Sequence, residues 1–127
     1  MAKTRTYINL PNRRNNLPYS DGVLVGDTLY LSGRIGLDPA TGMVPADLDQ
    51  EITFLLNAVR DVLAAANMTM DELVYVHIFC PDLSLFDRFN EKYRSYFKGE
   101  LPARAFIGSG PLLRNGHYEL QCIAVQR

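Results

Sequence analysis

The first hydrophobic runs of the chain are short, and two turn residues separate them. Gly22–Val25 and Thr28–Ser32 are rich in aliphatic and β-branched residues, with Gly26-Asp27 between them. A two-residue linker of this kind is typical of a β-hairpin. Asp38–Gly42 then predicts a turn, because its proline presets φ and its glycine accepts a positive φ.

After this turn the hydrophobic period changes to 3.6 residues, which predicts an amphipathic helix. Asp47 can cap the helix, with Gln50 at the capping-box spacing, and Asn67 is a suitable stop. The apolar positions of the helix share one stripe: Ile52, Leu55, Leu56, Val59, Val62, Leu63 and Ala66.

The next segments predict a strand and a second helix. Leu73–Cys80 is too short for a core helix and rich in branched and aromatic residues, so it is expected to be a buried strand. Ser84 with Asp87 can cap the following helix, and Lys98-Gly99 can end it. Its aromatic residues form a stripe: Phe86, Phe89, Tyr93, Tyr96 and Phe97.

Two further strands, Ala103–Ser109 and His117–Val125, complete the order ββαβαββ in a single domain spanning 1–127. Two amphipathic helices beside paired strands predict an α+β fold, with both helices on one face of a mixed, mostly antiparallel sheet. The other face would still carry apolar residues, and small domains often cover such a face by oligomerising. The residues expected there are Leu24, Tyr30, Val76 and Ile123.

Composition narrows the class of protein. Apolar residues make up 47% of the chain and charged residues 21%, with a formal net charge of −1. Nucleic acids and anionic membranes both require a basic field, so neither partner is expected. Arg13-Arg14 is interpreted as part of a solvated loop. No signal peptide or membrane span is visible, and Cys80 and Cys122 lie in strand-like runs, so buried free thiols and a cytoplasmic location are expected.

Several catalytic classes lack their signatures in this sequence. There is no zinc-deaminase motif, no metal-ligand cluster, no phosphate-binding glycine loop and no nucleophile elbow. We therefore expect no metal, and chemistry that uses positioning, hydrogen bonds and a water molecule.

Three polar residues stand at positions where either a structural or a functional role is open. His77 is interpreted as a packed, hydrogen-bonded core imidazole rather than a catalytic one, and His117 as exposed at the start of a strand. Asn90 lies on the apolar stripe of the second helix. A buried amide must be hydrogen-bonded, either to the backbone or to a ligand.

Arg104 is the only charged residue in LPARAFIGSG, residues 101–110. It shares a strand face with Phe106, while Glu119 and Gln121 share a face of the last strand. If these strands pair about a turn at 110–113, Arg104 lies opposite Glu119; a turn at 115–116 would separate them. A cross-strand salt bridge, worth under about 1 kcal/mol if exposed, and a guanidinium that binds a substrate carboxylate both fit the pattern.

Taken together, these motifs resemble those of the RidA/YjgF family of enamine and imine deaminases. The resemblance runs nearly from end to end, and its most specific elements are Ser-Gly, Asn-x-x-Tyr and Pro-Ala-Arg in this order. The matching segments are Pro18-Tyr19-Ser20, Gly26–Gly33, Leu37–Gly42, Asp82-Leu83, Phe89-Asn90 with Tyr93 and Phe97, Pro102-Ala103-Arg104, and Glu119 with Ile123–Val125.

The resemblance implies a chorismate-mutase-like fold and a homotrimer whose sheets form a central barrel, with active sites between subunits. It implies cofactor-free hydrolysis of imino acids, such as those formed from 2-aminoacrylate, to 2-keto acids and ammonia. In this family's terms, Arg104 binds the carboxylate and Glu119 positions or activates the water. The residues implied to line the pocket are Tyr19, Ser32, Gly33 and Asn90, with a backbone carbonyl near Phe106 holding the nitrogen.

The chain departs from the family pattern beside the site. Ala105 and Phe106 follow Arg104 where well-characterised members have Ser-Cys, and Arg34 replaces a frequent glutamine, which predicts a second cation near the cleft. These changes predict a larger or differently substituted substrate. The alternative is a trimer that binds small carboxylates without turnover. An RNA-cleaving role disagrees with the slightly acidic balance.

Overall fold

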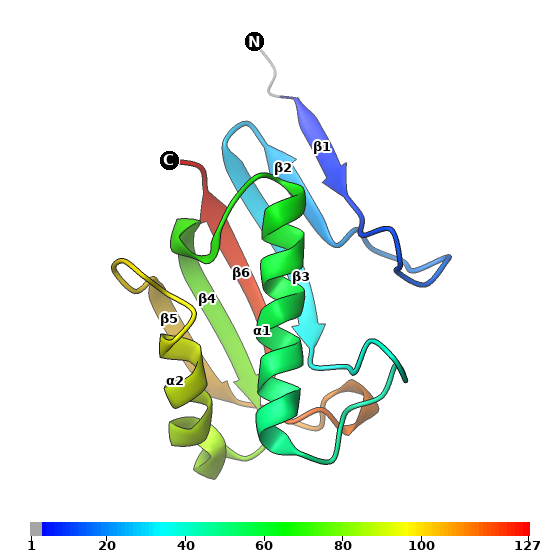
Figure 1. Ribbon diagram of the computed structural model, residues 1–127, viewed down its shortest axis with the longest axis vertical. Coiled ribbons are helices and arrows are strands. Elements are labelled where there is room, and N and C mark those ends of the chain that lie inside the picture. The colour runs from blue at the N-terminus through cyan, green and yellow to red at the C-terminus, as the bar shows by residue number, and fades with distance from the viewer. Residues whose placement is uncertain (1–3) are drawn as a thin grey trace.

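The computed structural model describes residues 4–127, which form a sheet with helices on one face (Figure 1). The strands are β1 (Arg5–Ile8), β2 (Gly22–Val25), β3 (Thr28–Ile35), β4 (Leu73–Cys80), β5 (Ala103–Gly108) and β6 (Glu119–Val125). The helices are α1 (Leu48–Ala65) and α2 (Phe86–Arg94), with short 3-10 turns at Met70–Glu72, Leu83–Leu85 and Leu113–Asn115.

The sheet has six strands in the order β1-β2-β3-β6-β4-β5. All neighbouring strands are antiparallel except β4 and β5, which are parallel. Parallel neighbours need a crossover connection, and α2 lies in the one between β4 and β5. Consequently β4 separates β5 from β6, and the pairing of the last two strands that the sequence left open does not occur.

The hairpin and α1 confirm the hydrophobic pattern. Val25 pairs with Thr28 across the two-residue turn, where Gly26 has φ of 62°. The Asp47 side chain accepts a hydrogen bond from the N–H of Asp49, which caps α1 without the predicted Gln50. Beyond the helix, Asn67 has φ of 59° and ends it. Every residue of the predicted apolar stripe is buried.

Several strand predictions need correction. β6 begins at Glu119 and not at His117, and β5 ends at Gly108, one residue before the predicted Ser109. The structure adds β1, a four-residue edge strand whose first three residues are exposed, so it has little hydrophobic pattern. It also extends β3 beyond Ser32 to Ile35. The extension contains a β-bulge: Leu31 pairs with Cys122 and Arg34 with Leu120, so two residues of β3 lie opposite one of β6.

The boundaries of α2 also differ from the prediction. Ser84 does not cap α2, which begins after Leu85 without a side-chain cap. Asp82 instead caps the 3-10 turn ahead of the helix, where its carboxylate accepts from both the N–H and the hydroxyl of Ser84. The helix ends at Arg94 instead of Lys98-Gly99. The aromatic stripe is therefore divided, because Tyr96 and Phe97 follow the helix and pack against the core from the connection.

The two faces of the sheet have different environments. Leu24 and Val76, which were expected on the uncovered face, lie on the helix side, since Leu24 pairs with buried Leu29 and Val76 is itself fully buried. The predictions for Tyr30 and Ile123 are correct. On the open face, one row of paired residues crosses the whole sheet and carries three exposed tyrosines: Tyr7, Val23, Tyr30, Ile123, Tyr75 and Ala103.

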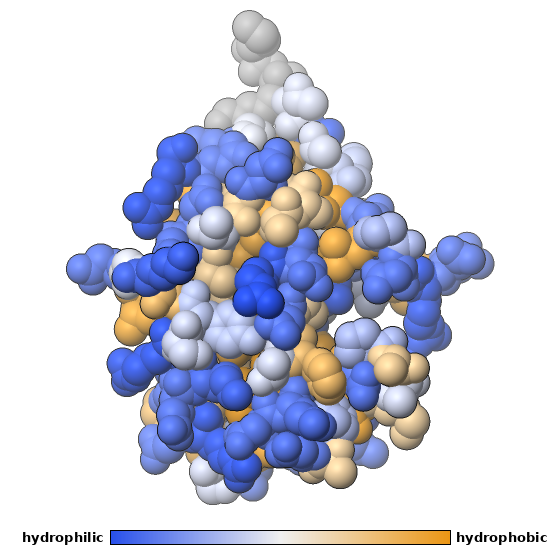
Figure 2. Space-filling view, in the orientation of Figure 1, coloured by the Kyte–Doolittle hydropathy of each residue, from blue (hydrophilic) through white to orange (hydrophobic). Residues whose placement is uncertain are grey.

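The helices shield the core from one side. In Figure 1, α1 lies over the middle of the sheet and α2 over the edge that β5 forms. Hydrophilic side chains cover most of this helix-bearing face in Figure 2.

Both cysteines, Cys80 and Cys122, are buried free thiols, as predicted, and burial raises the pKa of Cys122 to about 12. Within residues 4–127, neither helix combines the length and hydrophobicity needed to cross a membrane.

Gly36 tests the packing of α1 against the end of β3. A Cβ atom there would lie 2.1 Å from the backbone oxygen of Glu51, so Gly36→Ala should cost about 2 to 3 kcal/mol of unfolding free energy. Gly110→Ala is the control, because no atom lies within 4 Å of the added Cβ. Urea unfolding measures both variants, and equal stabilities would contradict the close packing.

Candidate functional site

Arg104 lies on the edge strand β5, on the helix side of the sheet, because it pairs with Val76. Its guanidinium carbon is 4.9 Å from the ring centroid of Tyr93, 5.5 Å from that of Phe106 and 5.6 Å from that of Phe86. Within residues 4–127 no carboxylate is within 4.0 Å of Arg104. Aromatic rings thus hold the guanidinium, and its charge is left without an ionic partner in the described chain.

Strand alternation and α2 build this aromatic surround. Phe106 is two residues after Arg104 and faces the same side, as predicted. Its ring meets Phe86 edge-on, with centroids 4.9 Å apart, and Phe89 at 5.8 Å. Cation–π contacts of this kind are worth about 0.5 to 2 kcal/mol each and leave the N–H edge of a guanidinium able to bind an anion.

Two polar groups of α2 in this region have no protein partner. The Asn90 side-chain oxygen and the Tyr93 hydroxyl are buried, and neither has a hydrogen-bond partner in residues 4–127. Asn90 and Tyr93 are three residues apart, which places them on the same side of a helix. Burial raises the pKa of Tyr93 to about 12, so the hydroxyl stays neutral and can donate a hydrogen bond.

Glu119 begins β6 and lies on the opposite face of the sheet from Arg104. It pairs with Phe79, three residues along β4 from the partner of Arg104, and residues an odd number apart face opposite sides. The Glu119 carboxylate lies against Gly33, where a Cβ atom would be 2.6 Å from its Oε2. Glu119 is half-buried, and no cation in residues 4–127 lies within 4.0 Å of it.

The β3 bulge connects Glu119 to the loop that precedes β2. Ser32 and Gly33 form the bulge. The N–H of Ser32 donates to the backbone oxygen of Asp21 at 3.0 Å, and its hydroxyl donates to the backbone oxygen of Ser20. The Ser-Gly pair therefore has two roles in the fold: the serine fixes the loop, and the glycine leaves room for the carboxylate.

Asp21 is a buried carboxylate that sequence inspection did not single out, and it organises this loop. Only 2% of it is exposed, and one oxygen lies 3.3 Å from Arg13 and 3.2 Å from Arg34. Its other oxygen accepts from the N–H of Leu10 at 2.8 Å. Arg34 is thus paired instead of being a free second cation, and Arg13 is a structural residue instead of a solvated one.

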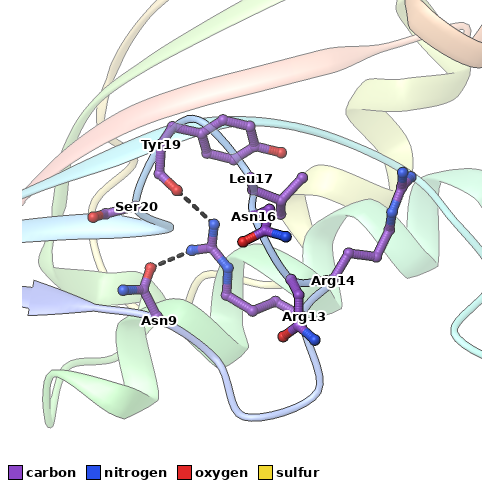
Figure 3. Close-up of a pocket in the computed structure, with 8 residues that line it drawn as sticks. Asn9, Arg13, Arg14, Asn16, Leu17, Tyr19 and Ser20 are labelled. Atoms are coloured by element: carbon purple, nitrogen blue, oxygen red, sulfur yellow. Dashed lines mark hydrogen bonds between the residues drawn. The ribbon is translucent and has the colours of Figure 1, made fainter.

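Tyr19 lies on this loop with its side chain 49% exposed. The Arg13 guanidinium is 5.6 Å from the Tyr19 ring centroid and donates to its backbone oxygen and to the Asn9 side chain (Figure 3). The loop surrounds an open hollow of about 480 Å³ with a polar lining, which includes Arg14 and Ser20. The hydrogen bond from the Ser32 hydroxyl to the backbone oxygen of Ser20 connects this loop to β3. The role of Tyr19 in substrate binding stays a prediction.

The prediction for His77 is wrong, whereas His117 is exposed as predicted and has an additional contact. His77 lies on the open face, stacked on Phe79 at 4.3 Å, and its Nε2 has no partner in residues 4–127, so the prediction of a hydrogen-bonded core imidazole is wrong. His117 is exposed as predicted, but its Nδ1 lies 2.6 Å from Oε1 of Glu51. Glu51 is fully buried and also accepts from the His117 N–H, which ties α1 to the start of β6.

The chain as a whole matches a known family. A family model described as endoribonuclease L-PSP matches residues 12–126. The 2-iminobutanoate/2-iminopropanoate deaminase of Mus musculus is 38% identical over 110 residues, covering 86% of this chain and 82% of the mouse protein. Protein DfrA of Myxococcus xanthus is 40% identical over 111 residues, covering 85% of each chain.

Solved structures agree with this match. The YjgF gene product of E. coli superposes with a TM-score of 0.88 at 30% identity, covering 96% of this chain and 99% of that one. RidA from an Antarctic Psychrobacter has a TM-score of 0.88 at 25% identity, covering 95% of this chain and 99% of that one. The chain therefore belongs to the RidA/YjgF family, as its motifs indicate.

The buried Asp21 cluster predicts a large effect on stability. Asp21→Ala would leave two arginines and one backbone N–H without their partner, so we expect a loss of about 3 to 5 kcal/mol. Asp49→Ala removes an ion pair to Arg88 whose side chains are both about half exposed, and should change stability little. Thermal and urea unfolding compare the variants. A small effect of Asp21→Ala would show that the loop does not depend on this carboxylate.

Proposed function

We propose that the protein hydrolyses imino acids to 2-keto acids and ammonia, with Arg104 and Glu119 as its catalytic residues. The observation that carries the proposal is the pair of unpaired opposite charges. A guanidinium and a carboxylate each lie half-buried without an ionic partner in residues 4–127. Relatives named as 2-iminobutanoate/2-iminopropanoate deaminases support the reaction class.

The chemistry needs few groups, because a protonated imine is already electrophilic. Arg104 binds the substrate carboxylate through paired N–H groups. Glu119 accepts a hydrogen bond from a water molecule and takes its proton as the oxygen attacks the imine carbon. The carbon–nitrogen bond then breaks with proton transfer to the nitrogen. One iminium and one water give one ketone and one ammonium ion, so the atoms and charges balance without a cofactor.

The site is proposed to form between copies of the chain. Arg104 and Glu119 face opposite sides of one sheet, so one chain cannot direct both at the same small substrate without a partner copy. The open face offers a surface for such a copy, because Tyr7, Tyr30 and Tyr75 are 60%, 51% and 36% exposed along one row. A chorismate-mutase-like homotrimer would pack these faces around a central barrel and set the edge of one chain against the next.

The remaining predicted residues would complete the pocket. Tyr19, Ser32 and Gly33 belong to the Glu119 side, whereas Asn90 and Phe106 belong to the Arg104 side. Phe106 places an aromatic wall beside the guanidinium, and we propose that it sets the substrate range. Arg34 would act indirectly, since it is bound to Asp21.

The activity test generates imino acids in situ with an amino-acid oxidase and measures ammonia release. Wild-type protein should accelerate the release. Arg104→Ala and Glu119→Gln should each lower the rate about a hundredfold or more. The first removes the guanidinium that binds the substrate carboxylate, and the second removes the base that accepts the proton of the water. Arg88→Ala, which alters an exposed pair, is the control.

The substrate panel contains short, branched and aromatic imino acids. A wild-type protein inert towards all of them would contradict the enzymatic proposal. Binding of 2-oxobutanoate without turnover would instead identify a carboxylate-binding trimer.

The assembly is tested by light scattering in solution. The wild-type protein should have three times the mass of one chain, and Tyr30→Asp should dissociate it, because the substitution buries a charge in the proposed interface. Leu113→Asp is the control: Leu113 is 77% exposed, but it lies in a turn outside the sheet. A monomeric wild-type protein would contradict a site shared between copies.

A further inference from the structure

Tyr93 has a buried hydroxyl that the fold does not use. Tyr93 is 4% exposed, and its hydroxyl has no hydrogen-bond partner in residues 4–127. Tyr118, in the same aromatic cluster, shows the ordinary arrangement: it is fully buried, and its hydroxyl donates to the backbone oxygen of Leu85 at 2.8 Å. A buried polar group without a partner destabilises a protein, so such a group calls for an explanation.

The groups around Tyr93 explain why its hydroxyl is left without a partner. Its ring is the aromatic group closest to the Arg104 guanidinium, with 4.9 Å between the ring centroid and the guanidinium carbon. One turn earlier on α2, the Asn90 side-chain oxygen is also buried without a partner. A cation, a hydroxyl and an amide oxygen from two elements thus lie in one region. The guanidinium is close enough to the Tyr93 hydroxyl to lower its pKa against the effect of burial. In residues 4–127, however, neither the hydroxyl nor the amide oxygen has a hydrogen-bond partner, and the guanidinium has no ion pair.

The structure assigns the Tyr93 hydroxyl as a substrate-binding group that donates a hydrogen bond to the carboxylate held by Arg104. This inference rests on the proposed function. A carboxylate has about four lone-pair sites, and a bidentate guanidinium uses two of them, so further donors can bind the same group.

The chemistry of a buried phenol fits a binding role and not an acid role. Burial raises the pKa of Tyr93 to about 12, so the hydroxyl remains protonated and gives up its proton reluctantly. It can therefore donate a hydrogen bond to an anion at any physiological pH. Its ring meanwhile supports the Arg104 guanidinium, so one residue orients the cation and adds a donor beside it.

This arrangement predicts effects of opposite sign on stability and binding. Without ligand, removing an unsatisfied hydroxyl should not destabilise the fold and can stabilise it. With ligand, the same change removes a hydrogen bond to a charged group, which corresponds to about a tenfold to hundredfold loss of affinity. Residues that serve function at the expense of stability are common in active sites.

The experiment measures 2-oxobutanoate binding by calorimetry and apo stability by thermal unfolding, on the full-length protein. Tyr93→Phe should raise the Kd about tenfold to hundredfold, with an apo Tm equal to or a few degrees above wild type. Tyr118→Phe is the matched control: it should lower the Tm by a few degrees, because Leu85 loses its donor, and leave the Kd unchanged. Arg104→Lys combined with Tyr93→Phe should weaken binding less than the two single effects predict, if both groups contact one carboxylate.

Wild-type affinity in Tyr93→Phe, or an equal loss in Tyr118→Phe, would overturn the assignment. If Arg104→Ala abolishes binding while Tyr93→Phe does not weaken it, only this inference fails. If the wild-type protein does not bind 2-oxobutanoate, or Arg104→Ala binds it normally, the proposed carboxylate site fails and the inference fails with it. Should Tyr93→Phe not fold, crystals of wild-type protein with 2-oxobutanoate decide: a hydroxyl within about 3.2 Å of a carboxylate oxygen supports the role, and a longer separation contradicts it.

Discussion

The parallel pairing of β4 and β5 is the constraint on which the rest of the site depends. It places β5 at the edge and β4 between β5 and β6, so Arg104 and Glu119 are never on adjacent strands. Because side chains alternate along a strand, the same register directs the guanidinium under α2 and the carboxylate to the open face. A pair of opposite charges that could have neutralised each other is thereby kept apart and available.

The molecule treats its buried polar groups in two ways. Asp21 and Glu51 are buried carboxylates whose oxygens have protein partners, and they join loops or elements that would otherwise be loosely connected. In residues 4–127, three buried polar atoms have no partner: Nε2 of His77 on the open face, and the side-chain oxygens of Asn90 and Tyr93 on α2, where Tyr93 lies beside Arg104. The satisfied groups stabilise the fold, whereas the two on α2 belong to the element that carries the aromatic neighbours of the unpaired Arg104 guanidinium, where we propose that a ligand binds. The contrast separates structural from functional polarity within one small domain.

The proposed site needs neighbouring copies of the chain, because Arg104 and Glu119 face opposite sides of one sheet. The row of exposed tyrosines on the open face and the edge position of β5 both leave surfaces that a single chain does not cover. The Ser32-Gly33 bulge contributes to the same site in two ways. Ser32 fixes the loop that carries Tyr19, and Gly33 leaves room for the Glu119 carboxylate. Phe106 packs against the Arg104 guanidinium, so in the proposed site this residue would limit which side chains the substrate can carry.

Local patterns determined the hairpin, α1, the bounds of β4 and the buried thiols, because periodicity and turn chemistry act over a few residues. The family was indicated separately, by the resemblance of its motifs. The isolated position of Arg104 among apolar residues and the polar Asn90 on an apolar stripe were also visible in the sequence. Only the tertiary structure decided the strand order, the β3 bulge, the cap at Asp82, the pairing of Arg34 with Asp21 and the lack of a partner for Tyr93. These depend on contacts between residues distant in the chain, and a hydroxyl's partner cannot be read from its neighbours in sequence.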